Sequence, residues 1–246
     1  MIDPLQSMRG AAPALAAEEA HLWLANLRLP AERLAVLTAT LTVDERERAG
    51  RFRFPEHQDR FIAGRGLLRE LLGIYLDQPA ALIRFNQGPR GKPVLVGQPA
   101  ETCLHFNLSH SSDQVLYAIA RCEVGVDLED MNRRLDYAAV AERICTSREW
   151  AVFQELPPAC AREEFFACWT RKEAVVKALG EGLAHGLGKL EVCLQGDDWV
   201  NQRVGLRDAA DREWSVLNVP IEPGWVAALA APGADWRWRG WRWNAG

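Results

Sequence analysis

Carboxylates alternate with apolar side chains in the segment VGVDLE, residues 124–129. If this segment is a strand, its valines and Leu128 face a core, while Asp127 and Glu129 face the other side beside Gly125. The two carboxylates then lie about 6.5–7 Å apart along the strand, and both can reach one Mg²⁺, which prefers oxygen ligands. A strand with a solvated polar face gives the same pattern, so the segment alone leaves both interpretations open.

A second charged pattern follows in FFACWTRKEAVVKALG, residues 165–180. As a helix, this segment places Trp169, Glu173 and Lys177 on one face, four residues apart. Glu173 and Lys177 in this order also make a favourable surface ion pair, which is the simpler interpretation. If the helix crosses the strand that carries Asp127, three carboxylates and a lysine converge, a set that suits metal-assisted phosphoryl transfer.

Two short segments could add further polar groups. GPRGKP, residues 88–93, is not a P-loop because its last proline stands where a serine or threonine is required, and a tight turn before a strand explains it equally well. NLSHSS, residues 107–112, brings Ser109 and His110 together but lacks the GxSxG pattern of a hydrolase. We interpret it as a turn between two strands, with hydroxyls and an imidazole that could line an anion site.

The elements that must position these residues occur in a repeated order. Capping boxes at Thr42–Glu45 and Thr146–Glu149 predict two short helices, the second reaching Leu156. Apolar periodicity predicts long helices over 58–76 and 162–179. Strands are expected over 21–29, 82–86, 93–96, 104–108, 115–120, 124–129 and in most of the chain after 190, including EVCLQ and the terminal WRWRGWRW.

The order strand, helix, strands therefore occurs twice, in halves that meet near residue 122. It predicts an α+β fold of two similar α/β lobes packed together in one chain, a pseudo-dimer, with lobes 1–122 and 123–246. No convincing residue-level repetition joins the two halves. The terminal WRWRGWRW is expected to pack its indoles as an edge strand, with nucleic-acid stacking as the alternative.

Length and composition limit the classes of protein. A chain of 246 residues with 48% apolar and 25% charged residues is globular and long enough for two lobes, which excludes a disordered chain. No stretch approaches the roughly 18–20 apolar residues of a membrane span, and residues 1–9 carry no basic leader before an apolar run. We therefore expect a cytoplasmic protein with no membrane partner.

Charge and cysteine usage narrow the partners. The six cysteines form no CxxC pair, which excludes the common zinc and iron–sulfur patterns and favours buried free thiols. A net charge of −4 argues against a nucleic-acid partner. Seven arginines stand between Arg46 and Arg69, so a local basic surface for a small anionic ligand is expected.

Taken in order, GKP, NLSHS, GVDLE and WxxKEAxxK, spread over about 90 residues, resemble the Sfp-type 4′-phosphopantetheinyl transferases, in the subgroup with W-x-x-KEA-x-x-K. The resemblance runs from near Arg48 through Leu187. It implies two similar lobes with coenzyme A in the cleft between them. It further implies Mg²⁺-dependent transfer of phosphopantetheine from coenzyme A to a serine of an apo carrier protein, with release of adenosine 3′,5′-bisphosphate.

The resemblance also implies roles by motif position. Asp127, Glu129 and Glu173 correspond to the Mg²⁺ ligands. Glu173 is in addition the candidate general base for the carrier serine, and Lys177 would contact the diphosphate on the leaving side. Lys172 has no evident role in this pattern.

Other residues match the part of the family pattern that holds coenzyme A. Lys92 and Pro93 match the stretch that borders the adenine, and Ser109 and His110 match a turn that contacts phosphate, with His110 facing the 3′-phosphate. Because lysine is absent before Lys92, arginine must bind the phosphates from the N-terminal lobe. The candidates are Arg48, Arg60 and Arg65.

Two alternative functions stay open on the sequence alone. The same acids could serve another Mg²⁺-dependent phosphoryl-transfer or diphosphate-cleaving enzyme, or the chain could be a non-catalytic scaffold that binds carrier proteins. Two lobes in one chain make a monomer sufficient for a complete site.

Overall fold

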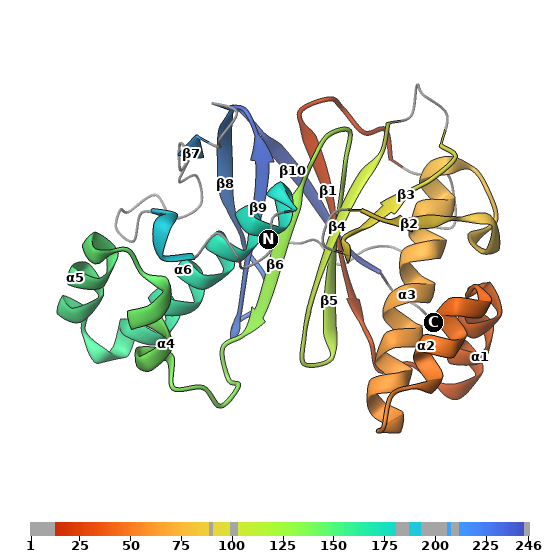
Figure 1. Ribbon diagram of the computed structural model, residues 1–246, viewed down its shortest axis with the longest axis horizontal. Helices are drawn as coiled ribbons and strands as arrows, with labels where there is room; N and C mark the ends of the chain where they lie inside the picture. Colours follow the sequence, from red (N-terminus) through yellow and green to blue (C-terminus); the bar gives the residue numbers. More distant parts are fainter. Residues whose placement is uncertain are drawn as a thin grey trace.

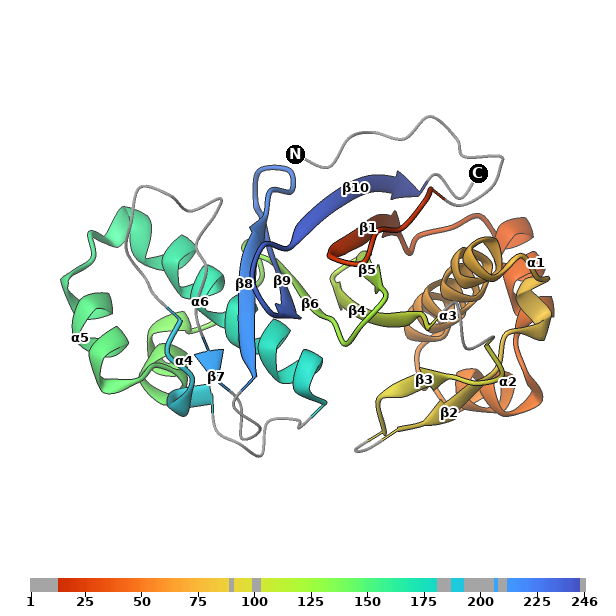
Figure 2. The same cartoon turned by 90° about the horizontal axis from the view of Figure 1, so that it is seen from above.

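Two four-stranded sheets lie at the centre of the computed structural model, with helices covering their outer sides (Figures 1 and 2). The structure describes residues 13–88, 91–98, 103–180, 187–192, 206–207 and 212–243. The first sheet has the strand order β10–β1–β5–β4 and the second β6–β9–β8–β7. The expected α+β class with two lobes is confirmed.

The elements follow the chain in two runs. The first run is β1 (Glu19–Asn26), α1 (Ala31–Thr40), α2 (Val43–Gly50), α3 (Pro55–Leu76), a 3-10 helix (Ala80–Leu82), β2 (Phe85–Gln87), β3 (Pro93–Leu95), β4 (His105–Ser111) and β5 (Gln114–Ala120). The second is β6 (Gly125–Asp130), α4 (Tyr137–Ile144), α5 (Ser147–Glu155), α6 (Pro158–Leu179), a 3-10 helix (Leu187–Lys189), β7 (Leu206–Arg207), β8 (Glu213–Val219), β9 (Trp225–Pro232) and β10 (Arg237–Trp243).

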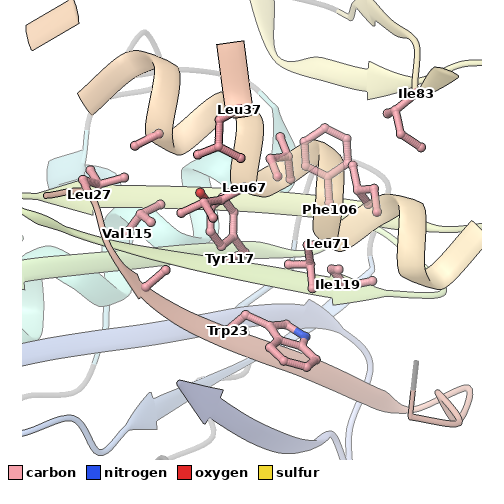
Figure 3. Close-up of a cluster of buried hydrophobic side chains, with 14 of the residues drawn as sticks. Trp23, Leu27, Leu37, Leu67, Leu71, Ile83, Phe106, Val115, Tyr117 and Ile119 are labelled. Atoms are coloured by element: carbon pink, nitrogen blue, oxygen red, sulfur yellow. The ribbon is translucent and has the colours of Figure 1, made fainter. Parts of the chain in front are cut away.

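Apolar side chains alternate along the central strands and fill cores on both sides of each sheet. On β5, Val115, Tyr117 and Ile119 face the N-terminal helices, and Figure 3 shows them packed with Leu67 and Leu71 of α3. The other face of β5 joins the inner face of β6, β8 and β9 in a second core between the sheets. The two lobes therefore share an apolar interface, and full burial of one leucine there contributes about 1.5–3 kcal/mol.

The last strand returns to the first lobe. β10 lies at the edge of the first sheet, parallel to β1, with Trp241 opposite Trp23. The indoles of Trp241 and Trp23 stack with ring centroids 4.8 Å apart. The edge-strand interpretation of WRWRGWRW is thus confirmed, and the indoles of Trp241 and Trp243 pack against the core of the first lobe.

The boundaries of several elements differ from those predicted. Helices α1 and α4 are not predicted from the sequence, because neither begins with a capping box of the kind that marks α2 and α5. Long helices α3 and α6 begin at Pro55 and Pro158, since proline is well accommodated in the first turn, where its missing N–H is not needed. Glu191 and Val192 lie outside any strand, and the rest of EVCLQ falls outside the described residues. No helix in the described ranges is long and apolar enough to cross a membrane.

The structure shows a repeat that the sequence hides. Both capping boxes form, and each capping glutamate also binds a buried cation from the long helix of its own lobe. Arg69 of α3 contacts Glu45 and the carbonyls of Ala80 and Ile83. The cations differ, arginine in one lobe and lysine in the other, so letter-by-letter comparison does not reveal the repeat.

In the second lobe the buried cation is Lys172. Its ammonium lies 2.6 Å from Glu149 Oε2 and donates to the carbonyl oxygens of Leu187 and Leu190 at 2.9 and 2.5 Å. Lys172 is fully buried, so it holds together α5, α6 and the segment after α6. The lysine of the KEA motif therefore has a structural role.

Removing this cation should destabilise the lobe. We expect Lys172→Met to lower the free energy of unfolding by about 3–5 kcal/mol, because the Glu149 carboxylate stays buried without its partner. Lys189→Met, at an exposed lysine nearby, should change it by less than about 0.5 kcal/mol. Urea unfolding followed by circular dichroism measures both, and equal losses would contradict the role of Lys172.

Helix α6 approaches β6 closely because of Gly125. A Cβ at this position would lie 2.0 Å from the Ala174 carbonyl oxygen and 2.4 Å from the Ala178 nitrogen, both in the backbone of α6. No side chain fits in this contact. The glycine therefore sets the depth at which α6 sits against the strand.

We expect Gly125→Ala to destabilise the protein by about 3 kcal/mol or more, since neither backbone can yield without moving the helix. Gly50→Ala is the matched control, because a Cβ there meets no atom within 4 Å and should be neutral. Thermal unfolding of both variants measures the difference. If Gly125→Ala is as stable as Gly50→Ala, the contact between β6 and α6 can accommodate a methyl group, and the proposed role of Gly125 is wrong.

Candidate active site

Strands β4 and β6 come from different lobes and are joined by side chains. Asn107 Oδ1 accepts the Val126 N–H at 3.0 Å, and the hydroxyl of Ser109 donates to Asp127 Oδ1 at 2.7 Å. Ser111 donates to Glu129 Oε2 at 3.0 Å and accepts the Asp130 N–H at 3.1 Å. Alternate residues of β4 thus bond along the whole of β6, at the junction seen between the sheets in Figure 1.

Asp127 lies at the centre of this junction. Its Oδ1 also accepts a hydrogen bond from Lys177 Nζ at 2.6 Å, and the same ammonium lies 2.8 Å from the Ser109 hydroxyl. The Asp127 side chain is buried, yet its Oδ2 has no hydrogen-bond partner among the described residues. A buried, unpartnered carboxylate oxygen is costly unless something binds it.

Glu129 follows on the same face of β6. Besides Ser111, Arg133 Nη1 lies 3.3 Å from its Oε2. Burial raises the pKa of Glu129 and outweighs the nearby Arg133, which lowers it. The predicted arrangement, with Asp127 and Glu129 on one face beside Gly125 and the valines in the core, is observed.

Glu173 reaches the same region from α6. Burial raises the pKa of Glu173, and the negative charge of Asp127 raises it further. A carboxyl group with a raised pKa is a better proton acceptor than an ordinary glutamate. The close contact of α6 with Gly125 shows that the helix does cross the strand, and the charges of Asp127 and Glu129 both raise the pKa of Glu173.

The three carboxylates are close but not in contact as a set. Among the described residues, their oxygens do not all come within 4.8 Å of one another. Like charges on one surface repel, and two of the acids instead bind the cations Lys177 and Arg133. Hard oxygen donors on one face, one of them unpartnered, fit a divalent cation such as Mg²⁺.

His110 lies on strand β4 and not on a turn, which corrects the expectation for both Ser109 and His110. The strand continues to Ser111, and the turn follows it. His110 is an exposed residue whose ring is partly desolvated, and this desolvation together with the positive charges of Lys177 and Arg60 lowers its pKa. The imidazole and the two cations come from three elements, and each cation also binds an aspartate, Asp127 or Asp113.

The three arginine candidates have different partners, and burial, together with the charge of Arg48, lowers the pKa of Arg65. Arg60 donates to Asp113 Oδ1 from Nε and Nη2 at 2.8 and 2.6 Å. Arg65 Nε lies 3.5 Å from Glu45 Oε1. Arg48 is exposed, with its guanidinium 5.2 Å from the centre of the Phe61 ring.

The side chain of Lys92, in the N-terminal lobe, contacts the C-terminal lobe. Its ammonium lies 2.7 Å from the Lys177 carbonyl oxygen, with the carbonyls of Val124 and Ala178 at 3.4 and 3.5 Å. Lys92 therefore binds the C-terminal end of α6, where the helix dipole favours a positive charge. Pro93 begins β3 beside it, paired with Gln87. The sequence did not predict this contact between lobes.

Comparison with known proteins agrees with the two halves of the chain. A family described as "4′-phosphopantetheinyl transferase superfamily" matches residues 123–230, and one described as "4′-phosphopantetheinyl transferase, N-terminal" matches 30–122. The 4′-phosphopantetheinyl transferase HetI of Nostoc sp. is 39% identical over 228 residues, covering 92% of this chain and 93% of that protein.

More distant relatives carry the same activity in their names. The 4′-phosphopantetheinyl transferase psf-1 of Bacillus pumilus is 31% identical over 173 residues, covering 70% of this chain and 72% of that protein. The L-aminoadipate-semialdehyde dehydrogenase-phosphopantetheinyl transferase of Homo sapiens is 28% identical over 202 residues, 76% of this chain and 65% of that protein. The chain belongs to the 4′-phosphopantetheinyl transferase superfamily and transfers phosphopantetheine from coenzyme A to carrier proteins.

Proposed function

We propose that this transferase binds Mg²⁺ through Asp127, Glu129 and Glu173, at the junction between lobes 1–122 and 123–246. The observation that carries this proposal is the buried, unpartnered Oδ2 of Asp127 on the face of β6 that α6 crosses. The bound ion would neutralise charge that develops on the diphosphate of coenzyme A. Strand β10 lies within residues 123–246 of the sequence but pairs with β1 in the first sheet, so it is an exception to this division into lobes.

The residues of α6 have separate tasks in this proposal. Glu173 accepts the proton of the carrier serine, for which its raised pKa suits it. Lys177 contacts the diphosphate and stabilises the leaving side, so its ammonium must share or leave Asp127 when coenzyme A binds. Ser109 and Ser111 orient Asp127 and Glu129 through the hydrogen bonds described above.

Coenzyme A would lie along the cleft toward the N-terminal lobe. His110 binds the 3′-phosphate, supported by the positive charges of Arg60 and Lys177 that surround it. The arginines Arg48 and Arg65 are the further phosphate candidates. Lys92 and Pro93 border the adenine, and the contact of Lys92 with α6 would link this end of the cleft to the helix that carries Glu173.

The proposal extends to the oligomeric state, the location, the subgroup and the partners of the protein. We propose that it acts as a monomer, because both lobes that border the site belong to one chain. We also propose a cytoplasmic location, the W-x-x-KEA-x-x-K subgroup and no nucleic-acid partner. The five described cysteines carry free thiols, which suits a reducing compartment.

The metal assignment is tested at Asp127. We expect Asp127→Asn to abolish Mg²⁺-dependent transfer and to weaken Mn²⁺ binding by at least tenfold in electron paramagnetic resonance titrations without coenzyme A, because a neutral amide oxygen binds a divalent cation more weakly than a carboxylate does. Asp130→Asn is the control, since Asp130 ends the same strand and binds Ser112 in a similar way. Equal Mn²⁺ affinities in the two variants would contradict the proposal.

The phosphate assignment is tested at His110. Coenzyme A and dephospho-coenzyme A differ only by the 3′-phosphate, which lies far from the reacting diphosphate. A hydrogen bond to that phosphate contributes about 1.5–3 kcal/mol, so His110→Ala should lower kcat/KM for coenzyme A by roughly tenfold to a hundredfold. The kcat/KM for dephospho-coenzyme A should hardly change. Equal losses of kcat/KM with both donors would mean that His110 only supports the structure of the strand and does not bind the phosphate.

A further inference from the structure

A pair of cysteines lies on the far side of α6 from the acids. The sulfur atoms of Cys145 and Cys168 and a carboxylate oxygen of Glu149 all lie within 4.8 Å of one another. Cys145 is half-buried between α4 and α5, and Cys168 is buried on α6 with 1% of its surface exposed. Two thiols from separate elements thus meet in a site where Cys145 is half-buried and Cys168 is enclosed.

The surroundings of these sulfurs disfavour a metal ion. Lys172 already places a positive charge 2.6 Å from Glu149 Oε2. The same carboxylate accepts the N–H groups of Thr146 at 2.8 Å and Val192 at 2.6 Å. Because Glu149 is fully engaged and a second cation would meet the Lys172 ammonium, the sulfurs are the groups left for chemistry.

The two thiols are chemically unequal. A hydrogen bond from Cys168 lowers the pKa of Cys145, and the same bond together with burial raises the pKa of Cys168. Cys145 is therefore the better thiolate of the two, and Cys168 is a thiol within reach of it. This division of roles is what thiol–disulfide exchange needs, since the thiolate attacks and the second thiol resolves the product.

We infer that Cys145 and Cys168 form a thiol–disulfide exchange site that reacts with low-molecular-weight disulfides such as oxidised glutathione. The Cys145 thiolate attacks one sulfur of that disulfide, forms a mixed disulfide and releases one thiolate. The Cys168 thiol then attacks the Cys145 sulfur and gives its proton to the second thiolate as that group departs, so a thiol is released. The two cysteines are oxidised by two electrons, and one small disulfide is reduced to two thiols.

The position of α6 determines what the bridge does to the protein. Gly125 holds the backbone of α6 against β6 without slack, so Cys168 stays in place and the segment around Cys145 moves toward it. Glu173 and Lys177 then keep their positions, and transfer activity should stay within about twofold. The bridge closes the loop from 145 to 168, which restricts the unfolded chain and stabilises the folded one.

The test uses the full chain in glutathione buffers of rising oxidised fraction. After acid quenching, alkylation and peptide mass spectrometry, we expect Cys145 and Cys168 to lose their reactive thiols together and to appear as one linked peptide. The melting temperature of that species should rise by roughly 5–15 °C, and dithiothreitol should reverse the rise. Cys160→Ser, at an exposed cysteine, is the control and should behave as the wild type.

Variants separate the two steps. In Cys168→Ala, Cys145 should accumulate as a mixed disulfide with glutathione, whereas Cys145→Ser should leave Cys168 reduced. If Cys168→Ala fails to fold, the wild-type titration still tests the inference, because it shows whether both thiols are lost together. Independent oxidation of the two cysteines would overturn the inference. So would a bridge to Cys193, which lies outside the described residues, or protection of both thiols by stoichiometric Zn²⁺.

Discussion

The hydrogen bonds from β4 to β6 hold the two lobes together at the point where the acids lie. The side chains of Asn107, Ser109 and Ser111 bond to β6 in place of a backbone ladder. The same bonds orient Asp127 and Glu129, so one set of contacts both joins the lobes and aims the carboxylates. Any shift between the lobes would therefore disturb the site directly, because the serines and the acids belong to different halves of the chain.

Helix α6 adds the third acid at a depth that Gly125 sets. A side chain at this position would collide with the helix backbone, so only glycine lets Glu173 and Lys177 approach β6 this closely. Lys92 then binds the end of the helix from the other lobe. The helix is thus fixed along one face and at one end, and the position of Glu173 relative to β6 is fixed with it.

The repeat of the two lobes lies in polar contacts more than in sequence letters. In each lobe a capping glutamate binds a buried cation of the long helix, Glu45 with Arg69 and Glu149 with Lys172. Such a pair needs further hydrogen bonds to offset its burial, and nearby carbonyls accept them from the cation in both lobes. The second lobe differs from the first in the charged residues of its long helix: Glu173 and Lys177 of α6 interact with Asp127 of β6.

The sequence by itself determined the local features, because they depend on neighbours in the chain. Alternation along β6 predicted the shared face of Asp127 and Glu129, and the capping boxes predicted where α2 and α5 begin. Only the tertiary structure decided which distant groups meet. Three contacts join segments far apart in the sequence: the pairing of β10 with β1, the bond from Lys92 to α6 and the burial of Lys172 against Glu149. Hydrophobic periodicity describes only neighbouring residues, so it cannot predict which distant segments come into contact.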